Sequence, residues 1–127
     1  WPVYIDQWGW GASEGYYDFF QDSKGWVESD IVDAIMPMLY GSQGDDMVKW
    51  QILLSDFLTT SNTEKIYPGI GTYDGDNFLP ILERITFARN AGASGHVVFS
   101  YSGIAQHDFW DDFRNGPYVR PATVPTQ

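Results

Sequence analysis

Residues 65–73 read Lys-Ile-Tyr-Pro-Gly-Ile-Gly-Thr-Tyr, and an earlier apolar run, Ile-Val-Asp-Ala-Ile-Met-Pro-Met-Leu-Tyr, occupies 31–40. A third run, His-Val-Val-Phe-Ser-Tyr, occupies 96–101. These runs start roughly 30 residues apart, which is the length of one strand-plus-helix unit. Near-continuous apolar runs between helical stretches are typical of strands in a parallel sheet that helices cover. The sequence therefore predicts an α/β fold built from parallel β/α units.

Helical patterns fill the spaces between these runs. Residues 45–60 are predicted to form a helix that begins at Asp45 and Asp46, because acidic residues suit a helix N-terminus. A second helix is predicted over 77–91, with Pro80 in its first turn and Gly92 as its C-terminal cap. Shorter helices are expected at 16–28 and 106–115, and 3–5 is expected to end an earlier strand. Prolines within two of the predicted strands indicate that those strands are short, because proline removes a ladder donor; they are Pro37 and Pro68.

Composition limits the classes of function. The chain has 127 residues, of which 43% are hydrophobic, so it can build one small core. The formal net charge of −10 argues against nucleic acid as a partner, because no basic stripe is present to neutralise phosphates. No apolar run approaches the roughly 18 residues that span a bilayer. The absence of Cys and the presence of only 2 His argue against a metal site, and no cofactor motif is found. Because the chain opens at Trp1 without an initiator Met, an upstream piece is expected.

Several motifs in order resemble one known family. The passage Asp-Ala-Ile-Met-Pro-Met-Leu-Tyr at 33–40 resembles the Asp-Tyr-Ile-x-Pro-Gln-x-Tyr strand of the glycosyl-hydrolase-like family 10 proteins, which are bacterial (β/α)8-barrel proteins. Residues 67–73 resemble the Gly-Ile-Gly-x-Tyr strand of that family, and 88–101 resemble its last helix-to-strand passage. Gln21, Asp22 and Trp26 fit the preceding helix. One departure is Met38, which stands where the family often has Gln, so a polar contact to substrate is absent there.

The resemblance implies part of a larger architecture. A complete barrel needs about 250 residues. Residues 1–115 are therefore expected to be the C-terminal half of a TIM-type (β/α)8 barrel, about strands five to eight, followed by a Pro-rich tail at 116–127. Such a half leaves sheet edges and an apolar inner face open, so it is expected to pack against the missing N-terminal half or to self-associate. The resemblance also implies an extracytoplasmic location.

The expected site lies at the C-terminal ends of the strands, where barrel enzymes place their chemistry. Glycoside hydrolysis usually requires two carboxyl groups. Asp6 and Asp74 are the acids at predicted strand ends, and they are the candidate catalytic residues. The alternative for Asp74 is a turn residue in Asp-Gly-Asp. Candidate substrate-binding residues surround these acids: Trp8, Trp10, Tyr40, Tyr73, Ser100 and Tyr101.

The aromatic content points to a carbohydrate partner. The chain contains 6 Trp, 8 Tyr and 8 Phe, and rings that are not needed in the core form flat surfaces for sugar faces. The first hypothesis is a glycoside hydrolase-like domain that acts on a polysaccharide, with peptidoglycan glycan strands as one case and with its catalytic carboxyl groups expected partly or wholly outside this segment. The second hypothesis is a non-catalytic carbohydrate-binding module. The third is a structural fragment that needs its N-terminal half.

Overall fold

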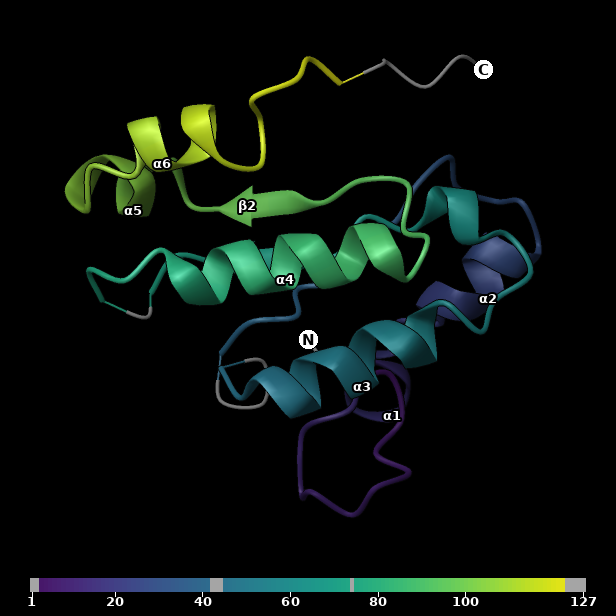
Figure 1. Ribbon diagram of the computed structural model, residues 1–127. Helices are drawn as coiled ribbons and strands as arrows, with labels where there is room; N and C mark the ends of the chain where they lie inside the picture. The colour runs from purple at the N-terminus through teal and green to yellow at the C-terminus, as the bar shows by residue number, and fades with distance from the viewer. Residues whose placement is uncertain (1–2, 42–44, 74, 123–127) are drawn as a thin grey trace.

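The computed structural model describes residues 3–41, 45–73 and 75–122 of the chain. Helices make up most of the regular structure, with two short strands on either side of α4 in the sequence, and Figure 1 shows the long helix α4 between strand β2 and the other long helix, α3. The elements are, in order, α1 (Gly15–Phe19), α2 (Ser23–Glu28), α3 (Met47–Phe57), the 3-10 helix η1 (Thr63–Lys65), β1 (Gly69–Gly71), α4 (Leu79–Asn90), β2 (Val97–Phe99), α5 (Tyr101–Gln106) and α6 (Trp110–Asn115).

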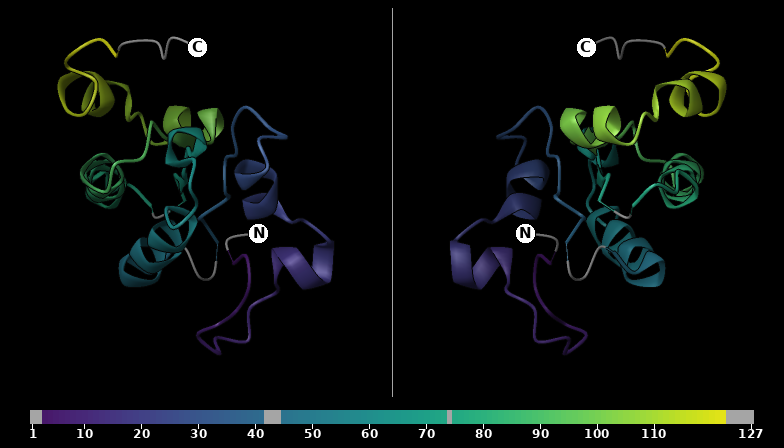
Figure 2. Two further views of the ribbon diagram at one scale, coloured as in Figure 1. Left: turned by 90° about the vertical axis from the view of Figure 1, so that its right-hand side faces the viewer. Right: turned by 90° about the vertical axis from the view of Figure 1, so that its left-hand side faces the viewer.

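The sheet consists of two parallel strands. Gly69 pairs with Val97, and Gly71 pairs with Phe99. Helix α4 connects the strands and contacts β1, while α3 packs against α4. Figure 2 shows α3 and α4 together on one side of the strands, with α1 and α2 on the other side of the molecule. The helices therefore cover one face of a very small sheet.

The expected half barrel over residues 1–115 is wrong. Within the described ranges, the only strands are β1 and β2, and two further segments make single parallel bridges. One bridge joins Ile35 to Ile66, and the other joins Val3 to Glu14. The described residues therefore do not form four barrel strands. Their fold is a small α/β arrangement.

Proline explains why the run at 31–40 does not become a strand. Its backbone does approach the next run: the amide of Ile35 donates to the Lys65 carbonyl at 2.9 Å, and the Pro37 carbonyl accepts from Gly69 at 2.8 Å. Pro37 itself has no N–H, so it cannot continue the ladder. The amide of Leu39 then donates to the Pro37 carbonyl at 2.9 Å, which turns the chain locally. The pairing stops after one bridge.

The two long helices confirm the sequence-based predictions at 45–60 and 77–91, with slightly shorter bounds. Asp46 caps α3, because its carboxylate accepts a hydrogen bond from the Lys49 amide at 2.9 Å. Pro80 occupies the first turn of α4, where a missing N–H costs little. Gly92 follows the end of α4 with a φ of +85°, a conformation that favours glycine. Local signals were sufficient for these two elements.

The other predicted helices were less accurate. The stretch at 16–28 divides into α1 and α2 because Phe20 adopts a left-handed conformation with a φ of 55°. Within the stretch predicted at 106–115, Gln106 ends α5 and the next helix, α6, begins only at Trp110; α5 itself was not predicted. Ser100 begins α5: its hydroxyl accepts from the Gly103 amide at 3.3 Å.

The core lies between the helices and the covered face of the strands. Its largest fully buried side chain is Trp50 of α3, whose indole N–H donates to the Gly69 carbonyl at 3.4 Å. Ile70 points into this core from β1 and is completely buried. The tail also packs: the Tyr118 ring lies 5.3 Å from the Phe113 ring and nearly parallel to it. The start of the predicted tail is thus held against α6.

Candidate functional site

Three aromatic rings meet where the parallel segments end. Tyr40 and Phe99 have ring centroids 5.2 Å apart with planes parallel to within 5°. The Tyr73 ring stands edge-on to both, with its centroid 6.0 Å from that of Tyr40 and 6.1 Å from that of Phe99. Tyr73 is 52% exposed and Phe99 is 47% exposed. We call these three rings the aromatic platform.

Glycines in β1 make the platform possible. A Cβ atom on Gly69 would lie 2.9 Å from the Tyr40 ring, and a Cβ atom on Gly71 would lie 2.8 Å from the Tyr73 ring. Both distances are too short for ordinary carbon contacts. Because side chains alternate across a strand, these glycines share the face opposite Ile70. The strand therefore buries Ile70 on one face and receives two tyrosine rings on its bare backbone on the other.

The platform phenols stay protonated at neutral pH. Burial raises the pKa of Tyr40, and the neighbouring Tyr73 adds to that rise. Burial also raises the pKa of Tyr73, with a further contribution from the carboxylate of Asp45. A protonated phenol both donates and accepts hydrogen bonds. The platform thus combines apolar ring faces with two neutral hydroxyl groups.

The remaining polar groups at these strand ends are engaged with one another. The Thr72 hydroxyl donates to the Phe99 carbonyl at 3.3 Å and accepts from the Ser100 amide at 3.1 Å. The Ser100 hydroxyl lies 2.7 Å from that of Ser102 and also caps α5. The Phe99–Ser100 peptide bond is cis. Ser100, a predicted substrate-binding residue, is therefore placed as a helix cap.

Tyr101 follows Ser100 and is 75% exposed. Its ring contacts Trp110 of α6, with centroids 5.4 Å apart and planes inclined by 57°. Tyr101 thus faces solvent beside a second half-exposed ring.

The predicted tryptophan pair in the N-terminal loop stacks on itself. The rings of Trp8 and Trp10 lie 4.7 Å apart and are inclined by 19°. The ammonium of Lys49 lies 5.0 Å from the centroid of the Trp10 ring. Trp8 lines an open depression of about 490 Å³ against α3. The faces of Trp10 are therefore partly occupied by neighbouring groups of the same chain.

Asp6 organises the loop that carries these tryptophans. Its two carboxylate oxygens accept from the Trp10 amide at 3.0 Å and from the Ala12 amide at 3.2 Å. These backbone donors, with Trp10 first, lower the pKa of Asp6. Its own amide donates to the Glu14 carboxylate at 2.6 Å. The Asp6 carboxylate is therefore ionised and accepts hydrogen bonds from the backbone of its own loop. Asp74, the other predicted catalytic residue, lies outside the described residues.

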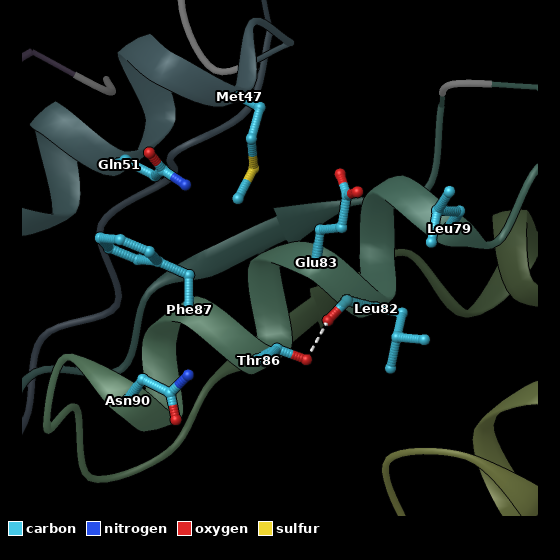
Figure 3. Close-up of a pocket in the computed structure, with 8 residues that line it drawn as sticks. All are labelled: Met47, Gln51, Leu79, Leu82, Glu83, Thr86, Phe87 and Asn90. Atoms are coloured by element: carbon cyan, nitrogen blue, oxygen red, sulfur yellow. Dashed lines mark hydrogen bonds between the residues drawn. The ribbon is translucent and has the colours of Figure 1, made fainter.

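A separate groove runs between the two long helices, away from the platform. Figure 3 shows Met47 and Gln51 reaching from α3 toward the space above α4, where Glu83 and Phe87 stand. The groove has a volume of about 530 Å³. Thr86, also at its edge, uses its hydroxyl to donate to the Leu82 carbonyl at 2.7 Å. The groove is an open depression between packed helices, and its polar lining residues are Gln51, Glu83, Thr86 and Asn90.

Sequence reasoning selected Tyr40 and Tyr73 of the platform but missed Phe99. Alternation along the strand separates Phe99 from Val98, but the register that pairs Phe99 with Gly71 on the open face is set by the folded structure. The rule that sites lie at the C-terminal ends of strands selected the next two residues, Ser100 and Tyr101, instead. The requirement for glycine at 69 and 71 was also missed, because it depends on rings from distant segments.

Within residues 3–41, 45–73 and 75–122, no three side chains of the metal-ligating types His, Cys, Asp and Glu come together as a potential ion site. Among those same residues, each helix falls short of the length and apolarity needed to cross a membrane.

Comparison with known proteins gave no match to a family model, to a curated protein or to a solved structure. The resemblance to glycosyl-hydrolase-like family 10 proteins therefore rests on the sequence motifs alone.

Proposed function

We propose that this chain binds a carbohydrate through the aromatic platform of Tyr40, Tyr73 and Phe99. The observation that carries the proposal is the seating of two tyrosine rings on the glycine backbone of β1, next to a half-exposed phenylalanine. A residue that only filled the core would be buried. Two rings about half exposed at one end of a sheet instead resemble a contact surface.

Carbohydrate is the ligand class that best fits this chemistry. The C–H faces of a sugar ring are apolar and pack on aromatic faces, while its hydroxyl groups exchange hydrogen bonds with groups such as the Tyr73 phenol. The formal charge of −10 disfavours uronic or sulfated polysaccharides, because like charges repel. We therefore expect a neutral glycan.

Binding is favoured over hydrolysis by the carboxyl groups. Glycoside hydrolysis requires a proton donor, usually a carboxyl group whose pKa is raised. The pKa of Asp6 and that of Asp30 are both lowered. Backbone amides, Trp10 first, cause the shift in Asp6, and the hydrogen bond from Lys65 causes the one in Asp30. The lowered pKa makes Asp6, one of the two candidate acids, a poor proton donor, and this supports the binding-module hypothesis.

The test is calorimetric titration with soluble glucan, xylan and chitin hexasaccharides. Tyr73→Ala removes one ring of the platform and is expected to weaken binding roughly tenfold. Gly71→Ala is expected to weaken it similarly, because its Cβ would displace the Tyr73 ring although all three platform residues are still present. Phe20→Leu is the matched control, since it removes an exposed ring from a distant helix end. Equal affinity in all four proteins would refute the proposal.

A parallel assay separates binding from cleavage. Reducing ends are measured after incubation of each hexasaccharide with the wild-type chain and with Asp6→Asn. Binding without release of reducing ends is the expected outcome. Release that disappears in Asp6→Asn would show that this chain is a glycosidase and that its platform is a substrate subsite.

A further inference from the structure

A second aromatic site lies at the other end of the molecule, around α1. The rings of Tyr16 and Tyr17 meet edge to face, with centroids 4.9 Å apart and planes inclined by 83°. Together with Phe20 and Asp22 they line an open cavity of about 360 Å³. We call these four residues the aromatic corner. It is built from residues that the carbohydrate proposal does not use.

Phe20 is unusual in both its backbone and its exposure. Its φ is 55°, in the left-handed region that glycine and asparagine occupy far more readily than phenylalanine. Its side chain is 88% exposed, which is the largest value among the exposed large hydrophobic side chains of the described residues. Strained backbone and an apolar ring in water both cost stability. A ring held this way beside a cavity points to contact with a ligand.

Asp22 supplies a fixed negative charge at the same cavity. Its Oδ1 accepts from the Tyr4 hydroxyl at 2.6 Å and from the Gly25 amide at 3.1 Å. These two bonds hold the carboxylate in place at the start of α2. Aromatic ring faces and a carboxylate that line the same cavity are complementary to a cation whose charge is surrounded by alkyl groups.

The neighbouring ring already accommodates such a group. The Lys24 ammonium lies 5.3 Å from the centroid of the Tyr4 ring. The Tyr4 ring in turn contacts Tyr16 at 5.5 Å. That ammonium is also paired with the Asp56 carboxylate at 2.9 Å, so a cation lies beside this aromatic cluster with a carboxylate as its direct partner. The net charge of −10 also attracts cations to the surface as a whole.

We infer that the aromatic corner of Tyr16, Tyr17, Phe20 and Asp22 binds an organic ammonium group, most favourably a methylated one. A methylated ammonium is weakly hydrated, so an open pocket can take it from water at low cost, and its methyl groups pack on ring faces. A simple metal cation lacks those methyl groups and fits an aromatic wall less well.

The experiment compares choline with 3,3-dimethylbutan-1-ol, which has the same shape without the charge. Binding of each to the full chain is followed by chemical-shift titration. Choline is expected to bind roughly fivefold more tightly, as a cation over exposed rings should. Equal affinity for the two compounds, or no saturable shift with choline, would overturn the inference.

Three variants and one control locate the site. Phe20→Leu is expected to weaken choline binding about threefold. Phe20→Tyr is expected to bind choline as tightly as the wild type, because tyrosine keeps an aromatic ring at this position. Asp22→Asn retains the cap of α2 but removes the charge, and it should also weaken choline binding. Tyr101→Leu is the control for an exposed ring elsewhere, and it should bind choline as the wild type does. Unchanged binding in Phe20→Leu and Asp22→Asn would refute this location even if choline binds.

Discussion

His96 should make the stability of the fold depend on pH. Its ring stacks on that of Tyr118, with centroids 5.7 Å apart, and its Nε2 lies 2.7 Å from the Tyr118 hydroxyl. Burial lowers the pKa of His96 from 6.5 to about 4, and the positive charge of Arg89 contributes to the lowering. The folded protein therefore keeps His96 neutral at pH values where the unfolded chain protonates it.

The sign and size of the effect follow from that pKa. As pH falls below 6.5, the unfolded chain gains a proton that the folded chain does not take up until about pH 4, so stability decreases across this window. The full displacement corresponds to about 3 kcal/mol between pH 7 and pH 4. Because the ring is partly exposed, we expect about 1–2 kcal/mol by pH 5.

The assay is urea unfolding at pH 7, 6 and 5, with the free energy of unfolding extrapolated to water. The control is His96→Phe, which retains a ring against Tyr118 but cannot titrate. The wild type should lose about 1–2 kcal/mol more than His96→Phe between pH 7 and pH 5. Parallel pH profiles for the two proteins would show that the folded state does not exclude the proton from His96.

Further substitutions test the packing. Gly69→Ala places a Cβ 2.8 Å from the Pro37 carbonyl oxygen and should destabilise the fold by about 1–3 kcal/mol in urea unfolding. The control is Gly15→Ala, whose Cβ would lie 3.5 Å from its nearest neighbour, the Val3 carbonyl oxygen. Trp50→Ala empties a completely buried position and should cost about 3–5 kcal/mol, seen as a lower melting temperature. Asp46→Ala removes the cap of α3 and should cost about 1 kcal/mol in urea unfolding, whereas a loss below 0.3 kcal/mol, roughly the error of the measurement, would contradict the capping bond.

The two long helices were accessible from sequence because their signals are local. The apolar spacing at Trp50, Leu54 and Phe57 fixes one face of α3, and its cap is three residues away from the amide it binds. The division of 16–28 was not accessible, since it depends on a left-handed conformation at Phe20 that phenylalanine rarely adopts.

Strand length was overestimated because pairing is not a property of one segment. An apolar run can form a strand only where a neighbour offers hydrogen bonds over the same residues. Pro37 interrupts that exchange, so the run at 31–40 ends as a single bridge at Ile35. The half barrel was inferred from three such runs and from the family resemblance. It is wrong because the described segments do not pair into a series of strands.

The sequence by itself determined the charge, the aromatic excess and the two long helices, because these depend on composition and on neighbours within four residues. Only the tertiary structure decided which rings meet. Tyr40, Tyr73 and Phe99 come from three separate segments, and they converge because the register of β1 with β2 sets Gly71 beside Phe99. A strand shifted by one residue would send those side chains to the opposite face, which is why the platform exists only in the folded chain.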